Sequence, residues 1–231
     1  MAIVHNLAMT PQEIQTVKFT PEGAAWMSCH FDPDGKGLMD LPPQLPRHAM
    51  LILDDSTPMI SQDSSQILSE LKEALERIHF EALLLDFQQK GSSQEGDLAK
   101  LLSQELSCPV GVSEGYAQQT EGPVFLPLLP PHRPLVPYLL PWKGRELWLE
   151  IGPGCEQALV TETGTTFTSC SAPLPPCPQL HKGLCCHYGI QPEDRQIRFT
   201  LVRTPDDLRA LRKEAETLGV TRTVGLYQEL V

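Results

Sequence analysis

The 231-residue sequence is poor in basic residues, long apolar runs and aromatic side chains, and each shortage excludes a class of protein. Lysine and arginine total 18 against 29 acidic residues, which gives a net charge of −11, and no basic cluster interrupts this acidity. The charge argues against nucleic acid or an anionic membrane surface as a partner. No stretch approaches the roughly 18 consecutive apolar residues of a membrane span. Residues 1–15 have no positive segment followed by a long apolar one, so we expect no signal peptide.

Cysteine and proline bear on compartment and loop structure. Seven cysteines, an odd number, favour free thiols in a reducing compartment, so we expect a cytoplasmic protein with seven free thiols. The 22 prolines are about double the usual share of ~5%. They cluster in residues 31–48, 124–144 and 171–179, which we expect to be extended loops packed on the fold, because proline removes a backbone donor.

The first half of the chain alternates between short apolar runs and amphipathic segments. Runs at 23–31, 48–56, 81–88 and 108–116 read as strands, and those hydrophobic on both faces are typical of a parallel sheet. A helix is predicted between the second and third runs, with Ser64 or Ser65 as its cap. Its apolar stripe is Ile67, Leu68, Leu71, Leu75 and Ile78. A second helix is predicted around Leu98–Leu106, and this alternation indicates βαβ units.

The second half contains strands with fewer helices. Further strands are predicted at 122–129, 146–152, 195–202 and 223–230, and a β-hairpin at 157–169. One helix begins at Thr204 as cap with Pro205 in its first position and stops near Gly219. Eight strands with about half the expected helices predict a single domain over 1–231, a compact, incomplete (β/α)8 barrel with an inserted β-hairpin. A doubly wound parallel sheet is the alternative.

Two segments carry a resemblance to a known family. In "EALLLDFQ" (81–88) an apolar run ends in polar residues, and "FTLVRTPDDLRALRKEAETLGVTRTVGLYQEL" (199–230) is a strand–helix–strand pattern. Both resemble glycoside hydrolase family 18, the chitinase-like barrels, whose motif is D-x-x-D-x-D-x-E. In that register Glu81, Leu84, Asp86 and Gln88 occupy the four acidic positions. The second segment resembles the family's final strand–helix–strand unit, with Tyr227 in place of the tryptophan at the sugar site.

The resemblance implies a degenerate hydrolase site. In the family the terminal glutamate protonates the leaving oxygen, and the preceding aspartate orients the substrate's N-acetyl group. Gln88 can donate a hydrogen bond but cannot transfer a proton, and Leu84 removes the carboxylate that would tune Asp86. We therefore expect a chitinase-like pseudoenzyme with impaired or absent hydrolase activity, one that binds a saccharide in the barrel mouth.

Two alternatives remain open. Asp54, Asp55 and Glu114 follow predicted strands and would share the mouth with Asp86, so one of them could replace the missing acid in an active glycosidase acting on N-acetylglucosamine-type saccharides. These three residues, with Tyr116 and Tyr227 as aromatic rim residues, are the candidate substrate-binding set. The third class is a scaffold or partner-binding protein whose mouth is closed by Pro130–Pro141.

We expect no cofactor and no resident metal. One segment, 177–189, carries side chains able to ligate zinc, namely Cys177, His181, Cys185, Cys186 and His187. Their spacing is not that of a zinc finger or ribbon, although three of them would share a face if the segment were helical. A pair of adjacent cysteines in an apolar segment is more typical of buried small hydrophobes. Metal binding by this segment, the particular sugar and the oligomeric state are left open by the sequence.

Overall fold

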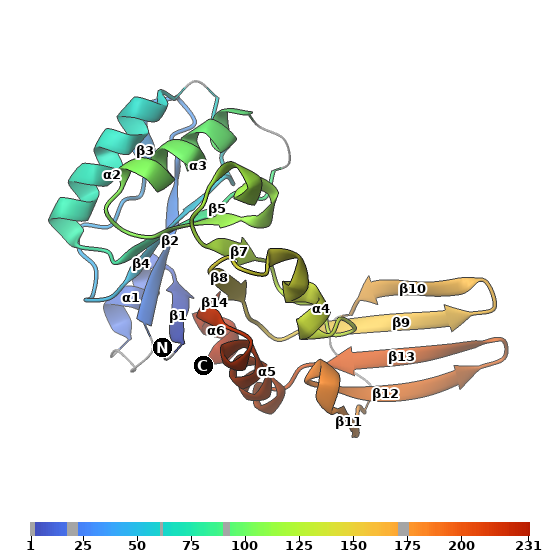
Figure 1. Cartoon of the computed structure of the whole chain (residues 1–231). Helices are drawn as coiled ribbons and strands as arrows, with labels where there is room; N and C mark the ends of the chain where they lie inside the picture. Colours follow the sequence, from blue (N-terminus) through green and yellow to red (C-terminus); the bar gives the residue numbers. More distant parts are fainter. Residues whose placement is uncertain (1–2, 18–22, 61, 90–92, 171–175) are drawn as a thin grey trace.

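The computed structural model describes residues 3–17, 23–60, 62–89, 93–170 and 176–231, and its larger part is a closed barrel of eight parallel strands (Figure 1). In chain order the barrel strands are β1 (Val4–Met9), β2 (Gly23–Phe31), β4 (Met50–Asp54), β5 (Ala82–Asp86), β6 (Val110–Ser113), β7 (Val124–Leu126), β8 (Leu147–Glu150) and β14 (Val220–Leu226). Strand β1 pairs with both β14 and β2, which closes the ring. A short strand, β3 (Leu38–Met39), pairs antiparallel with β2 outside the ring. The predicted barrel is confirmed, and the doubly wound alternative is excluded.

The membership of the ring differs from the prediction in one strand. The segment 195–202 was counted as a barrel strand, but β13 (Gln196–Val202) belongs to a separate antiparallel sheet. Its place in the ring is taken by β1, which the sequence analysis missed. That strand carries the polar residues His5 and Asn6 in its middle, and Asn6 is nevertheless buried inside the fold. The interrupted apolar run therefore gave no strand signal.

The predicted strand–helix–strand unit at 199–230 needs the corresponding correction. Its first strand, β13, belongs to the other sheet. Only helix α5 (Pro205–Thr217) and the strand that follows it, β14, belong to the barrel. The helix itself is as predicted. Thr204 is its cap, Pro205 stands at its start, and Gly219 follows its end with a positive φ of 89°.

Three longer helices cover the barrel. α2 (Ser64–Ile78) follows β4, α3 (Ser93–Glu105) follows β5, and α5 precedes β14. The cap of α2 is Asp63 rather than Ser64 or Ser65, since its carboxylate accepts a 2.8 Å hydrogen bond from the Ser65 amide. The remaining helical segments are short: α1 (Pro11–Thr16), η1 (Glu114–Gln119), α4 (Leu135–Leu139), η2 (Leu140–Trp142), η3 (Lys182–Leu184) and α6 (Tyr227–Leu230). The shortage of full helices in the second half of the chain was predicted.

The proline-rich segment 124–144 is not only extended loop. Its strand β7 lies within the strand predicted at 122–129, whereas α4 and η2 fall where only extended loop had been expected. Pro137 lies at the third position of α4, within the first turn, where a backbone N–H has no intrahelical partner and proline is tolerated.

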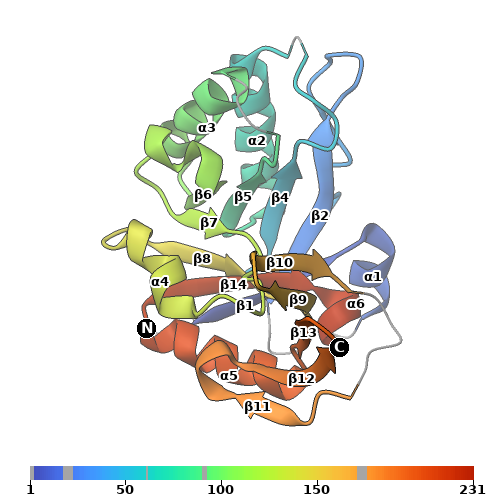
Figure 2. The ribbon, with the colours of Figure 1, turned by 90° about the vertical axis from the view of Figure 1, so that its right-hand side faces the viewer.

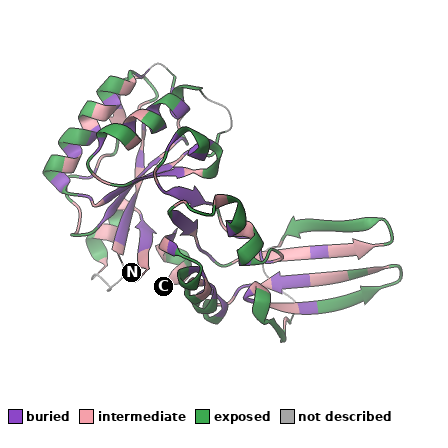
Figure 3. Ribbon diagram, viewed as in Figure 1, coloured by how far each residue is buried: buried purple, intermediate pink, exposed green. Residues whose placement is uncertain are grey.

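The barrel has one apolar layer inside and a larger one outside. Residues two apart along a strand share a face. The inner layer consists of Ala8, Ala25, Met50, Ile52, Ala82, Leu84, Phe125, Trp148 and Val224. The outer layer packs the other face of the strands against the helices, whose solvent side is exposed (Figure 3). Trp26 and Trp148 are both buried.

The second sheet is inserted between β8 and α5. It has five antiparallel strands in the order β10-β9-β13-β12-β11, and it projects from the barrel next to α4 and α5 (Figure 1, Figure 2). Its strands are β9 (Cys155–Thr161), β10 (Gly164–Ser169), β11 (Gln179–His181), β12 (Cys186–Glu193) and β13. The predicted inserted hairpin is confirmed as β9–β10. The insertion is larger than that hairpin, because β11, β12 and β13 complete the sheet.

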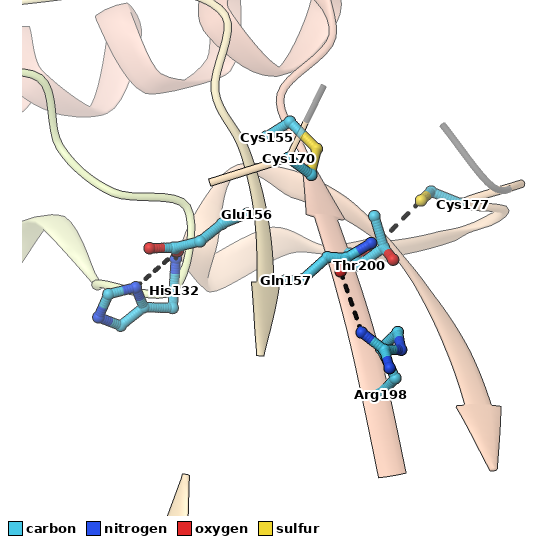
Figure 4. The surroundings of a disulfide bond; sticks show 8 residues. All are labelled: His132, Cys155, Glu156, Gln157, Cys170, Cys177, Arg198 and Thr200. Carbon is cyan, nitrogen blue, oxygen red and sulfur yellow. Dashed lines mark hydrogen bonds and ion pairs between the residues drawn. A yellow bond between two sulfur atoms is a disulfide. The ribbon is translucent and has the colours of Figure 1, made fainter. Parts of the chain in front are cut away.

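A disulfide joins the ends of this hairpin. Cys155 and Cys170 are bonded at a sequence separation of 15 (Figure 4). The Cys170 amide also donates to the Cys155 carbonyl at 3.2 Å. The prediction of seven free thiols is therefore wrong. The free cysteines are Cys29, Cys108, Cys177, Cys185 and Cys186. An odd count excludes complete pairing but not a single bond, and disulfides persist in oxidising compartments, so the cysteines no longer favour a reducing one.

Candidate functional site

Carboxylates gather at the C-terminal mouth of the barrel. Asp54, Asp86 and Glu150 end β4, β5 and β8, and each lies two residues after a side chain of the inner layer. Side chains two apart on a strand point the same way, so all three extend the interior layer into the mouth. Asp54 and Asp86 are direct neighbours in the parallel pairing of β4 with β5. The mouth of a (β/α)8 barrel is where this fold places its chemistry.

A cavity of about 670 Å³ opens beside Asp86. Its size lies within the range of roughly 300–1,000 Å³ typical of small-molecule sites. The lining combines carboxylates, amides and aromatic rings, and it consists of Asp86, Phe87, Gln88, Gln89, Ser113, Glu114, Gly115, Tyr116, Phe125, Pro127, Leu128 and Glu150. No residue of 130–141 is among them, so this lining offers no support for a mouth filled by Pro130–Pro141.

Asp86 and Gln88 contact each other at the edge of the cavity. The Gln88 amide nitrogen Nε2 lies 3.3 Å from both carboxylate oxygens of Asp86. Burial raises the pKa of the Asp86 carboxyl, and the hydrogen bond from Gln88 opposes this rise. The charges of Asp55 and Asp54 raise the pKa further, while a hydrogen bond from Ser113 opposes them. The result is a carboxyl group that holds its proton to a higher pH than an exposed aspartate does.

Glu150 lines the cavity together with the carboxylates of Asp86 and Glu114, and it was not among the predicted site residues. Burial raises its pKa; a 3.0 Å hydrogen bond from the Leu128 amide to Oε2 opposes the rise, and the charges of Asp86 and Glu229 add to it. The signal that would have found it was present. Glu150 lies near the C-terminal end of the strand predicted at 146–152, just as Asp86 lies near the C-terminal end of the strand predicted at 81–88.

The structure brings two of the predicted substrate-binding residues to the cavity. Glu114 lines it and is exposed. Tyr116 lines it as well, but its side chain is only 4% exposed, and its hydroxyl lies 2.7 Å from both the Gln89 carbonyl oxygen and Glu95 Oε2. Its ring meets Phe87 edge-on at 5.8 Å. Tyr116 therefore forms part of the cavity wall rather than an open stacking platform.

The other three lie outside the cavity lining. Asp54 accepts a 2.8 Å hydrogen bond from the Ser56 amide. Asp55 is buried, accepts from the Gln89 amide at 2.7 Å, and so holds the segment after β5. Both act on the cavity through their charge on Asp86. Tyr227 is the half-buried first residue of α6 and is not among the lining residues.

The candidate metal ligands of segment 177–189 are not on a helix. His181 ends β11, while Cys186 and His187 begin β12. His187 instead bonds Asp207 through Nδ1 at 2.8 Å, and the Cys185 thiol lies 3.3 Å from Glu214 Oε2. Within the described ranges, no group of three or more His, Cys, Asp or Glu side chains is arranged to hold a metal ion.

Together these features define a (β/α)8 barrel with an acidic cavity at its mouth and an antiparallel sheet inserted after the seventh barrel strand. At the level of sequence, no family model and no curated protein matches this chain. Solved structures of chitinase-like proteins do share its fold.

Three of these structures illustrate the similarity. The chitinase-like agglutinin RobpsCRA from Robinia pseudoacacia is 10% identical, with a TM-score of 0.59 over 95% of this chain and 93% of that one. A mutant class V chitinase from Nicotiana tobaccum, in complex with NAG4, is 9% identical, with a TM-score of 0.57 over 97% and 93%. The spore cortex-lytic enzyme SleL of Bacillus cereus is 11% identical, with a TM-score of 0.56 over 96% and 70%. At such identities the likeness shows a chitinase-like fold, as the sequence resemblance predicted.

Proposed function

We propose that this protein is a saccharide-binding member of the chitinase-like barrels whose hydrolase activity is impaired or absent. The observation that carries the proposal is the pairing of Gln88 with Asp86 at the cavity. The sequence resemblance aligns Gln88 with the proton donor of the hydrolases. A carboxylic acid there would protonate the leaving oxygen, whereas an amide keeps its protons at every working pH. General acid catalysis contributes about 10²- to 10⁴-fold, so its loss removes most of the hydrolytic rate.

The composition of the cavity lining supports sugar binding. Phe87 and Phe125 contribute apolar surface, while Gln88, Ser113 and the carboxylates offer donors and acceptors for hydroxyl groups. A pocket of this volume accommodates a few sugar units at most. The tobacco chitinase with the same fold is in complex with NAG4, which makes an N-acetylglucosamine-type saccharide the first ligand to test.

Gln88→Glu tests the proposal directly. The new carboxyl group would lie close to Asp86, and like-charge repulsion would raise the pKa of one member of the pair. We expect wild-type protein to bind an N-acetylglucosamine-type oligomer in calorimetry without cleaving it, and the variant to gain measurable cleavage of a chromogenic oligomer. The gain is limited because Leu84 leaves the inner carboxylate missing. Gln191→Glu adds the same charge at an exposed position of the inserted sheet and serves as the matched control.

A second candidate function is an active glycosidase with a displaced acid. The observation that favours it is Glu150, a half-buried carboxyl of raised pKa in the same cavity as Asp86. Such a group is suited to general acid catalysis. In that case wild-type protein hydrolyses the oligomer, Glu150→Gln removes the activity, and Gln88→Ala leaves it intact. That combination of results would overturn the proposal that hydrolysis is lost.

A further inference from the structure

The charged side chains that line the cavity, among the described residues, are all acidic. Asp86, Glu114 and Glu150 line it, and none of the described lining residues is basic. Asp54 and Asp55 add negative charge from just outside the lining, as their effect on the Asp86 carboxyl shows. Glu229 of α6 acts on Glu150 in the same way. Asp86 at the end of β5, Glu114 after β6 and Glu150 at the end of β8 thus line one cavity, and further negative charges act on it from outside the lining.

The hydrogen-bond partners of Asp86 and Glu150 are neutral groups. Asp86 receives hydrogen bonds from the Gln88 amide, and Glu150 receives one from the Leu128 backbone. Neither carboxyl forms an ion pair among the described residues. Among the described residues, the exposed Arg133 lowers the pKa of Tyr138, which the charges of Glu114 and Glu150 raise.

A half-buried carboxylate pair without a counter-ion is costly to ionise, and a cation entering the cavity relieves that cost. An ammonium group carries three donors, enough to bridge the oxygens of two carboxylates while it keeps one for a further acceptor. A neutral acetamide offers a single N–H donor and no charge. The electrostatics therefore favour a cationic ligand over a neutral one of the same shape.

We propose that the saccharide this cavity selects carries a protonated amine, and that it is a de-N-acetylated glucosamine unit held between Asp86 and Glu150. The inference rests on the proposed saccharide site and names its substrate class. The Gln88 amide then donates to a sugar hydroxyl, and Phe125 provides apolar contact for the ring. Glu114, at the exposed edge of the cavity, attracts the cation and stays exposed to solvent when the ligand is bound.

Binding should have a defined pH window. It weakens at low pH as Asp86 and Glu150 take up protons, because their charged forms hold the ammonium. It weakens again at high pH as the sugar amine loses its proton, which for an amine of α-amino type occurs near pH ~8. The charges of Asp54 and Asp55 on Asp86, and of Glu229 on Glu150, move the acid limb to higher pH. The exposed residues Glu114 and Arg133 have opposite effects on the pKa of Tyr138, which Glu150 also affects.

The test compares a glucosamine tetramer with an N-acetylglucosamine tetramer by calorimetry on the full chain at pH 6.5. Charge-assisted hydrogen bonds contribute about 1.5–3 kcal/mol, so we expect the glucosamine tetramer to bind about tenfold or more tightly. Glu150→Gln should reduce that preference to within about threefold, by the same conversion. Glu162→Gln removes an equal charge at an exposed position of the inserted hairpin and should keep it. Spermine serves as a cation without a sugar ring.

The outcomes separate this inference from the proposed function. Equal binding, or tighter binding of the N-acetylated tetramer, overturns the amine selectivity and leaves the saccharide site standing. Binding of neither tetramer removes both. Spermine displacing the glucosamine tetramer at equal concentration would show attraction to charge alone and would also overturn the inference. If Glu150→Gln does not fold, Glu114→Gln at an exposed position replaces it, with a partial loss of preference expected.

Discussion

The indole of Trp148 occupies the space that a side chain on Gly111 would need: a Cβ at Gly111 would lie 2.3 Å from two of the Trp148 ring carbons. Trp148 is fully buried inside the barrel, and the guanidinium of Arg222 lies 5.2 Å from the centre of its ring. A side chain of this size fits in the interior because β6 presents a hydrogen atom at the facing position. The pair lies in the barrel interior next to the cavity, because Ser113 and Glu150, each two residues further along the same strands, line that cavity.

Gly111→Ala should destabilise the protein by about 1–3 kcal/mol, the usual cost of overpacking a core. Urea unfolding followed by tryptophan fluorescence measures the change. Gly115→Ala is the control, because nothing lies within 4 Å of a Cβ at that position. Equal stability of the two variants would show that the interior yields to the added methyl group.

Arg203 ties the inserted sheet to the loop after β7. Its side chain is 2% exposed and donates to the carbonyl oxygens of Leu129, Pro130 and Leu184. Arg203→Met should lose about 2 kcal/mol or more, because buried acceptors are left without a donor. It should also speed proteolysis within residues 155–202.

Arg209→Met is the matched control, since that side chain is exposed and its ion pair with Asp206 is of a kind worth about 0–1 kcal/mol. Arg203→Met as stable and as protease-resistant as this control would contradict the anchoring role.

The Cys155–Cys170 bond closes a loop of 15 residues. Such a loop is worth about 3 kcal/mol in the chain-entropy treatment. Thiol titration of the denatured protein should find five reactive groups before reduction and seven after it. Cys155→Ser and Cys170→Ser should each lower stability by a similar amount, and the double variant by no more. Seven reactive thiols before reduction would mean that the bond does not form.

Asp207 makes stability depend on pH at the start of α5. Its carboxylate receives hydrogen bonds from the Thr204 amide and hydroxyl and from His187, each at 2.8 Å. Burial works against ionisation, but these bonds outweigh it and the pKa of Asp207 is lowered. Its contribution is therefore present above the ordinary aspartate pKa of ~3.9 and is lost as pH falls through the lower folded-state value.

Asp207→Asn should cost about 1–2 kcal/mol at pH 7 and flatten the acid limb of the stability profile. Asp206→Asn changes an exposed neighbour in the same turn and should keep the limb. Urea unfolding at a series of pH values between about 2 and 7 measures both profiles. An unchanged limb in Asp207→Asn would assign the pH dependence to other carboxylates.

Local pattern was enough to predict much of this protein. The apolar runs before Asp54 and Asp86 read correctly as barrel strands, because both faces of a parallel strand are buried in this fold. The cap and stop of α5 were also local, since Thr204, Pro205 and Gly219 act on their own backbone. Asp86 and Gln88 were assigned to the end of one predicted strand, but their contact with each other is a finding of the structure.

Tertiary structure decided the rest, because it depends on which distant segments meet. Strand β1 belongs to the ring because it pairs with β14 and β2. Strand β13 lies outside the ring because it pairs with β9 and β12 instead. The Cys155–Cys170 bond likewise depends on the pairing of β9 with β10. Glu150 becomes a cavity carboxylate because closure of the barrel brings the end of β8 to the same mouth as β5. Sequence periodicity determines which face of a strand a side chain occupies, whereas only the closed ring determines which other side chains it faces.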